Sequence, residues 1–283
     1  MTLDNDRIAG ELRDFIAGIG AGPVFVHSDP LSTAALVPRA RDRGGLLDSH
    51  VELLVRIADG RGLWAPAFNY DFPRSRRFDV SNDLCQLGPL PEHFRSQRAD
   101  WRTHVPIFSV SGIGPDPGVV WGPDTDPFGP ASIFRELAAR DGVILYYGNT
   151  FHYSTIIHYA ERQGGGPLYR YDKEFPGTVI VADGSAVTGS LNYHVRPLGA
   201  GLDYDWDRLL REAVEAGVCH RSGRYSQVLA ASAQGLTRFF REAMNDDPFA
   251  LLDEKSRSWV IPAYEEAGRR FLIGDFESPV TWG

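Results

Sequence analysis

Cysteine, lysine and long apolar runs are all scarce in this sequence of 283 residues. The two cysteines, Cys85 and Cys219, lie far apart and outside any activating motif, which excludes a disulfide framework and a cysteine-based zinc site. The only lysines are Lys173 and Lys255, and the net charge is −8. Because no basic stripe with interleaved aromatic residues is present, we expect no nucleic-acid partner.

No stretch approaches the roughly 18 consecutive apolar residues that a transmembrane helix needs, so we expect no membrane association. The N-terminus, MTLDNDRIAGELRDF, is acidic and amphipathic and lacks the charged-then-apolar layout of a secretory signal. These two absences predict a cytoplasmic protein. The sequence gives no indication of the oligomeric state.

Helical and strand patterns alternate along the first 160 or so residues, and strands then pair locally. We expect helices near 5–19, 46–58, 132–140, 205–216 and 236–244, and a further helix from about 153 within 149–165. Strands are expected within 22–30 and near 63–68, 105–114 and 143–148, with a hairpin within 177–199. Residues 69–100 are expected to be irregular. The pattern predicts a single α/β domain over 1–283, with a mixed central sheet flanked by helices and a C-terminal hairpin and helices.

The segment 149–165, NTFHYSTIIHYAERQGG, places polar groups in an otherwise apolar helix. Thr155, His158 and Glu161 follow an i, i+3, i+6 spacing, so they fall in one stripe about 120° wide. A carboxylate one turn from an imidazole can fix its tautomer and raise its basicity, which makes a general base. The preceding strand pattern, VILYYG, would deliver the helix to the carboxyl edge of the sheet, where ligands bind in α/β folds.

Other interpretations of this segment remain open at the level of spacing alone. A His-x-x-Glu pair can be purely structural, and His152, His158 and Glu161 could bind a metal, although the spacing is not His-Glu-x-x-His. A Gly-x-Ser-x-Gly elbow, a phosphate loop and a dinucleotide fingerprint in the right context are all missing. We therefore expect no metal and no serine nucleophile.

Four stretches in order resemble the aminoglycoside 3-N-acetyltransferase family. They are VFVHSDPLS, RTHVPIFSVSGIG, FGPASIFRELAARDGVILYYGNTFHYSTIIHYAE and PLYRYDKEFPG. The family shows a strand ending in His-Ser-Ser, an Arg-Ser-His-Pro-like stretch and a Thr-x-x-His-x-x-Glu helix. The resemblance covers roughly residues 8 to 270 and is strongest from about 100 to 175. It implies that His158 is the general base, that Glu161 orients it and that Thr155 is a further catalytic residue.

The resemblance also implies that acetyl-coenzyme A is the cosubstrate. The residues that it assigns to the coenzyme site are His27, Ser28, Arg102, Thr103, His104 and Ser109. This chain departs from the family pattern at Asp29, which stands where the family has serine, and at Val105, which is inserted before Pro106.

The expected activity is direct acetyl transfer to a primary amine of an amino sugar or an amino-sugar-like metabolite. Alternatives are another acyl-coenzyme A donor acting on a nucleotide-linked or natural-product amine, or a non-catalytic coenzyme A-binding homologue. Arg170, Asp172 and Lys173 follow the helix and are the predicted acceptor-binding residues. With the RSRR run at 74–77, they could hold an anionic acceptor, whereas a cationic aminoglycoside would need acidic residues instead.

Overall fold

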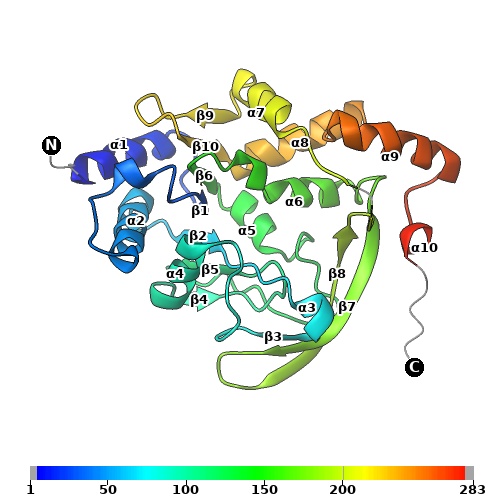
Figure 1. Cartoon of the computed structure of the whole chain (residues 1–283), viewed down its shortest axis with the longest axis horizontal. Helices are drawn as coiled ribbons and strands as arrows, with labels where there is room; N and C mark the ends of the chain where they lie inside the picture. Colours follow the sequence, from blue (N-terminus) through cyan, green and yellow to red (C-terminus); the bar gives the residue numbers. More distant parts are fainter. Residues whose placement is uncertain (1–4, 200, 278–283) are drawn as a thin grey trace.

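A mixed sheet of seven strands forms the centre of the computed structural model, which describes residues 5–199 and 201–277 (Figure 1). In spatial order the strands are β4 (Trp101–Arg102), β5 (Val110–Ile113), β2 (Leu63–Pro66), β1 (Val24–Ser28), β6 (Val143–Tyr147), β10 (Val228–Ser232) and β9 (Cys219–Arg221). The central strands β2, β1 and β6 are parallel, and the outer pairings are antiparallel. The carboxyl ends of β1 and β6 therefore meet at one edge of the sheet.

The sheet is covered by helices on both faces because its central strands are buried at almost every position and are mostly apolar. In β1, Val24 and Val26 pack in one cluster, whereas Phe25 packs in the other, as the two-residue period of a strand requires. Helices α1 (Asn5–Ala17), α2 (Arg43–Ala58) and α4 (Pro89–Gln97) cover the first face, and α5 (Ile133–Ala139), α6 (Ile156–Gln163) and α8 (Ala233–Asp246) cover the second. Each fully buried large aliphatic side chain in these layers stabilises the fold by about 1.5–3 kcal/mol.

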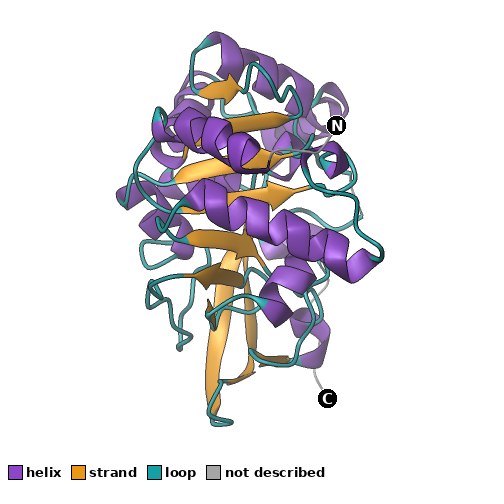
Figure 2. Ribbon diagram, turned by 90° about the vertical axis from the view of Figure 1, so that its left-hand side faces the viewer, coloured by secondary structure: helices purple, strands orange, loops and turns teal. Residues whose placement is uncertain are grey.

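A long hairpin projects away from the main sheet (Figure 2). Its strands are β7 (Tyr171–Ile180) and β8 (Ala186–Val195), and the short strand β3 (Arg77–Asp79) adds to β7 in parallel. The remaining elements are the short helices α3 (Phe72–Ser75), η1 (Ala34–Leu36), η2 (Phe151–Tyr153) and α10 (Ile273–Phe276), and the longer helices α7 (Trp206–Glu215) and α9 (Glu254–Ala267).

The predicted fold class, a mixed sheet flanked by helices with a following hairpin and C-terminal helices, is confirmed. The expectation that 69–100 would be irregular is wrong in part, because α3, β3 and α4 lie in this range. The extension of a single domain over all of 1–283 stays a prediction, since residues 1–4, 200 and 278–283 lie outside the described residues. Within the described residues, every helix is too short or too polar to cross a membrane.

Candidate active site

The turn after β6 brings the start of α6 to the carboxyl edge of the sheet. Gly148 has a φ of +118°, a conformation that L side chains rarely adopt, and it sends the chain through η2 into α6. Ser28 at the end of β1 pairs with Tyr147 at the end of β6. The turn after β1 therefore lies beside the segment that leads into α6.

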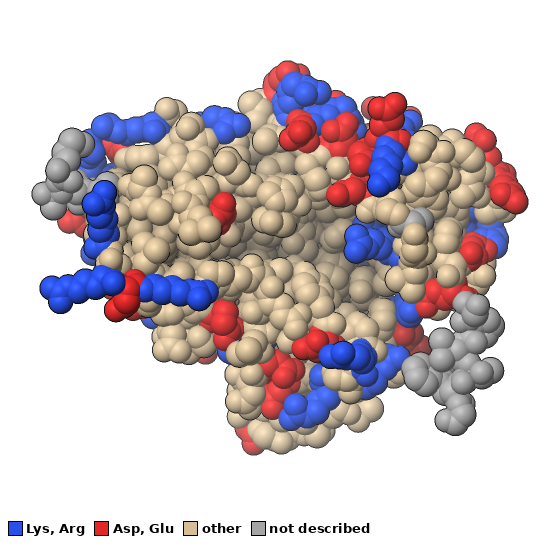
Figure 3. All heavy atoms as spheres, viewed as in Figure 1, with Lys and Arg blue, Asp and Glu red and all other residues tan. Residues whose placement is uncertain are grey.

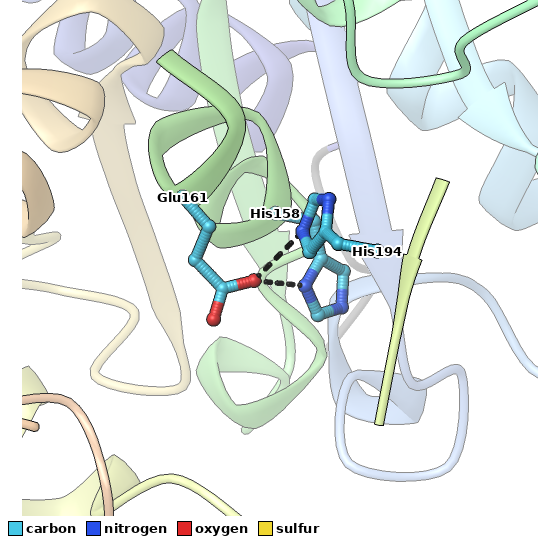
Figure 4. A group of neighbouring side chains, drawn as sticks. All are labelled: His158, Glu161 and His194. Carbon is cyan, nitrogen blue, oxygen red and sulfur yellow. Dashed lines mark hydrogen bonds and ion pairs between the residues drawn. The ribbon is translucent and has the colours of Figure 1, made fainter. Parts of the chain in front are cut away.

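Glu161 is the centre of a buried cluster on the inward side of α6 (Figure 4). Its Oε2 accepts hydrogen bonds from Nδ1 of His158 at 2.9 Å and from Nε2 of His194 on β8 at 3.0 Å. Its Oε1 accepts from the hydroxyl groups of Tyr204 at 2.6 Å and Tyr169 at 2.9 Å. Both carboxylate oxygens are therefore fully used within the protein.

Arg170 supplies the positive charge that balances this buried carboxylate. Its Nε lies 3.4 Å from Glu161 Oε1, and its Nη2 donates to the Tyr204 hydroxyl at 2.7 Å. Burial by itself would raise the pKa of Glu161, but the attraction of Arg170 and the two imidazole hydrogen bonds hold it well below the usual value. Glu161 is thus an anion, which is the state needed to orient an imidazole.

His158 is neutral at physiological pH and presents one nitrogen to the solvent side. Burial lowers the pKa of His158 to about 4, although the neighbouring Glu161 acts in the opposite direction. The hydrogen bond to Glu161 places the proton on Nδ1, so the lone pair is on Nε2. The His158 side chain is 25% exposed whereas that of Glu161 is fully buried, so the imidazole alone of this pair can reach a ligand.

The same three residues, His158, Glu161 and His194, are close enough to be considered as metal ligands. Two features favour hydrogen bonding over metal coordination. Each imidazole already has a carboxylate oxygen of Glu161 as the partner of one ring nitrogen, and both hydrogen bonds would have to be broken for these nitrogens to bind an ion. In addition, Arg170 already neutralises the carboxylate and would repel a second cation in this place.

Two cavities lie on either side of the entry to α6, within the hollow across the middle of the face in Figure 3. The strand-end cavity has a volume of about 520 Å³ and is lined by the ends of β1 and β2, by the turn after β6 and by Thr155. The hairpin cavity has a volume of about 530 Å³ and is lined by β7, β8 and His158. Tyr70 and His152 line both, so the two cavities adjoin at these residues.

A family model described as aminoglycoside 3-N-acetyltransferase matches residues 60–245, about two thirds of the chain and the whole of the α6 segment. The chain belongs to this family. It is therefore an N-acetyltransferase of the acyl-CoA:amine class, as the resemblance predicted. No curated protein sequence matches the chain.

Solved acetyltransferase structures share the fold at low sequence identity. AAC-IIIb in a binary complex with CoASH is 17% identical, with a TM-score of 0.65, 84% of this chain covered and 96% of that one. The apoenzyme of AAC(3)-IVa is 19% identical, with a TM-score of 0.64 and coverage of 94% and 98%. A mutant of AAC(3)-IVa in complex with apramycin is 18% identical, with a TM-score of 0.63 and coverage of 86% and 93%.

The residues predicted for the acetyltransferase's coenzyme site separate into two groups. His27 and Ser28 line the strand-end cavity. Arg102 and Ser109 are buried against the main chain, where both bond to the carbonyl oxygen of Ala67. Thr103, also buried, accepts a hydrogen bond from the Val110 amide, and His104 lines neither cavity. For Arg102, Thr103, His104 and Ser109, coenzyme binding stays a prediction that no cavity contact supports.

The predicted acceptor-binding residues separate in the same way. Arg170 and Lys173 line the hairpin cavity, and Lys173 pairs with Glu277. Asp172 points elsewhere and pairs with Arg162 and Arg270. Thr155 stands immediately before α6, where its hydroxyl donates to the carbonyl of Tyr153 and does not bond His158. The RSRR run at 74–77 lies outside the cavity lining.

Sequence reasoning missed three of the residues that hold the acetyltransferase's buried carboxylate. His194, Tyr204 and Tyr169 come from β8 and from two loops, at 33, 43 and 8 residues from Glu161. The sequence of β8 gives no signal for His194, because this buried residue falls in the polar register of the strand with Ser190 and Asn192. Only the folded chain reveals that the three side chains converge.

Proposed function

We propose that this acetyltransferase transfers the acetyl group of acetyl-coenzyme A directly to a primary amine, with His158 as general base. The observation that carries the proposal is a neutral imidazole held by Glu161 through Nδ1 at the edge of the hairpin cavity. Its free Nε2 is available to a ligand there. Thr155, one turn earlier, lines the adjoining cavity.

The strand-end cavity is the proposed site of the pantetheine arm. Its lining combines prolines with small polar side chains, including Ser28, Asn149 and Thr150, which suits a narrow chain of methylene and amide groups. His27 is buried at its floor, and its Nε2 has no hydrogen-bond partner among the described residues. The position of Thr155 would bring the thioester end of the arm toward His158.

The hairpin cavity is then the proposed acceptor site. An amine attacks a thioester only through its lone pair, yet most alkylamines are protonated near pH 7. After the ammonium has lost one proton to solvent, Nε2 of His158 accepts a second proton from the nitrogen as the N–C bond forms. The C–S bond breaks to release the coenzyme thiolate, which takes up that proton from His158. Such general base catalysis contributes about 10²–10⁴ in rate. The step needs no covalent enzyme intermediate.

The acceptor expected from the family is an amino sugar. The structural relatives include complexes with apramycin and with sisomicin, which makes aminoglycosides the first compounds to test. Because the sequence identity to these relatives is low, the similarity shows only that the fold is shared. The acceptor of this chain therefore has to be inferred from its own cavity.

The test is to replace His158 by alanine and to measure both thiol release and coenzyme A affinity. We expect turnover to fall by about 10²–10⁴ while the affinity for coenzyme A stays within twofold. His220→Ala, at an exposed histidine on β9, is the matched control and should retain wild-type turnover. Wild-type turnover by His158→Ala would contradict the mechanism. Loss of wild-type turnover on chelation, restored by added zinc, would instead indicate a metal at His158, Glu161 and His194.

A further inference from the structure

The hairpin cavity has an aromatic wall, defined here as the rings of Phe108, Phe128, Phe175 and Tyr193. The rings contact one another, with centroid separations of 4.7 Å for Phe108–Phe128, 5.1 Å for Phe108–Tyr193 and 5.5 Å for Phe175–Tyr193. Phe128 also lies 5.2 Å from the ring of His158. The aromatic wall therefore begins beside the proposed base and extends along the hairpin.

The backbone next to Phe108 is strained in a way that builds this wall. Ile107 has a φ of +64°, which is unfavourable for a β-branched residue. The Ile107 side chain is buried, and its carbonyl accepts a hydrogen bond from the Asn69 amide, so the surrounding structure holds this conformation. Strain of this kind concentrates at functional sites, and here it directs the following residue, Phe108, into the cavity lining.

The charged groups of the cavity leave little for a highly charged acceptor. Three basic residues and two acidic residues line it, namely Arg170, Lys173, Arg196, Asp203 and Glu277. Arg170 is paired with Glu161, and Lys173 with Glu277. Asp203 already accepts hydrogen bonds from the Tyr204 amide and from the Trp206 indole.

This pairing of charges disfavours both a cationic and an anionic acceptor, the two classes considered from the sequence. A polyamine with several ammonium groups would find Glu277 already paired with Lys173 and Asp203 already accepting two hydrogen bonds, and the exposed Arg196 would oppose its binding. A phosphorylated acceptor would meet basic groups that are already paired, except at the exposed Arg196. The uncharged aromatic wall is the surface that remains for recognition.

We infer that the acceptor carries a single primary aliphatic amine on an aromatic body, an inference that rests on the proposed acetyl transfer. Stacking against Phe108 and Tyr193 would hold the aromatic body. The ammonium group can lie against the ring faces before it loses one proton to solvent, and the neutral amine then gives its second proton to His158 as the N–C bond forms. An arylalkylamine has this chemistry, and so does an aromatic natural product with one amino group.

Thiol release from acetyl-coenzyme A should be measured with tryptamine, kanamycin and glucosamine 6-phosphate, which represent the aromatic monoamine, the polycation and the anionic amino sugar. We expect kcat/KM for tryptamine to be at least tenfold higher than kcat/KM for kanamycin or for glucosamine 6-phosphate. Phe108→Leu, which keeps an apolar side chain, should raise the KM for tryptamine about tenfold and leave the KM for acetyl-coenzyme A unchanged. Phe15→Leu, the same change at a half-buried ring on α1 outside both cavities, is the matched control and should retain the wild-type KM.

The possible outcomes separate this inference from the proposed function. Faster His158-dependent turnover of kanamycin or glucosamine 6-phosphate would leave acetyl transfer standing and overturn the aromatic acceptor. If coenzyme A binds but none of the three amines is acetylated, the proposed function fails. Calorimetry of tryptamine binding to the coenzyme A complex then decides the inference: binding weakened by Phe108→Leu supports it, and no binding overturns it.

Discussion

At the scale of the residue, Glu161 is the group on which the site depends most. Two imidazoles, two phenol groups and one guanidinium face its two oxygens. A glutamine in its place keeps one carbonyl acceptor but turns an amide donor toward other donors, and it removes the charge that balances Arg170. Removing one member of a buried ion pair costs about 3–5 kcal/mol, because the other charge stays buried without compensation.

Glu161→Gln should therefore lower both stability and activity. We expect the free energy of unfolding to fall by about 3–5 kcal/mol, measured by urea denaturation. The pKa of His158 should move further below its wild-type value of about 4, because the attraction of the carboxylate for the imidazolium is lost. Turnover should fall, but less than in His158→Ala. Glu212→Gln, at a partly exposed i, i+4 pair with Arg208, is the control and should cost about 1 kcal/mol or less.

Individual residues also show where sequence reasoning stops. The spacing of His158 and Glu161 is local, so a helix period was enough to predict that they meet. The approach of His194 and Tyr204 depends on how β8 and the loop after it return to α6, and no local pattern encodes that return. Arg170 was predicted to bind the acceptor, and the structure adds a role that its sequence position did not reveal, the neutralisation of Glu161.

At the scale of the element, the connection from β6 to α6 positions the site, and Gly148 is its critical residue. A Cβ at Gly148 would lie 2.5 Å from Ser32 Oγ and 2.9 Å from Asp29 Cβ, in addition to the cost of a φ of +118°. Gly184, at the tip of the hairpin, also has a positive φ of +83°, but a Cβ there would meet nothing within 4 Å. Comparing substitutions at Gly148 and Gly184 separates the free-energy cost of a positive φ from the free-energy cost of the steric clash.

Gly148→Ala should destabilise the protein more than Gly184→Ala. Positive φ alone costs of order 1–3 kcal/mol, which both variants bear, and the clash at Gly148 adds to it. Because the displaced turn also lines the strand-end cavity through Asn149 and Thr150, Gly148→Ala should weaken coenzyme A binding as well. Urea denaturation and coenzyme A titration of both variants check this. Equal stability losses would show that the clash is relieved without cost.

The elements themselves were predictable to different degrees. Buried strands such as β1 and β6 begin with an unbroken apolar run and stand between turn residues, so the sequence alone locates them correctly. The predicted hairpin begins at 177, whereas β7 begins at Tyr171, because charged residues at the start of the strand weaken its pattern. The short elements α3 and β3 depend on packing against the hairpin rather than on any periodicity of their own.

At the scale of the whole molecule, two cores share one sheet, and the candidate site lies where elements of the second core meet the sheet edge. The core around α1, α2 and α4 packs on the face of the sheet opposite to α6. The core around α5, α6 and α8 also includes the hairpin strands, so His158 and the aromatic wall are fixed in one packed unit. Rigid placement of a base beside its acceptor cavity is what general base catalysis needs.

This packing also buries several imidazoles in their neutral form, which makes the stability of the whole molecule depend on pH. Burial lowers the pKa of His27 to about 3 and the pKa values of His50 and His158 to about 4. In the unfolded chain each imidazole would take up a proton near pH 6.5. Between that value and pH 4 the unfolded state therefore binds more protons than the folded state, so stability must fall as the pH falls.

We expect the free energy of unfolding, measured by urea denaturation, to be nearly constant from pH 8 to 7 and to decrease steadily from about pH 6.5 to 4.5. Each buried imidazole adds about 1.4 kcal/mol per pH unit to the limiting slope. Below the usual pKa of a glutamate, Glu161 acts in the same direction, because its carboxylate is held ionised in the folded state.

His50→Asn should reduce the slope by about one proton, whatever its effect on stability at pH 7, since His50 is buried and bonds the Tyr147 hydroxyl. His220→Asn, at an exposed histidine, should leave the slope unchanged. A stability that stays flat down to pH 4.5 would mean that the buried imidazoles are protonated in the folded state, and His158 could then not accept the proton of an amine.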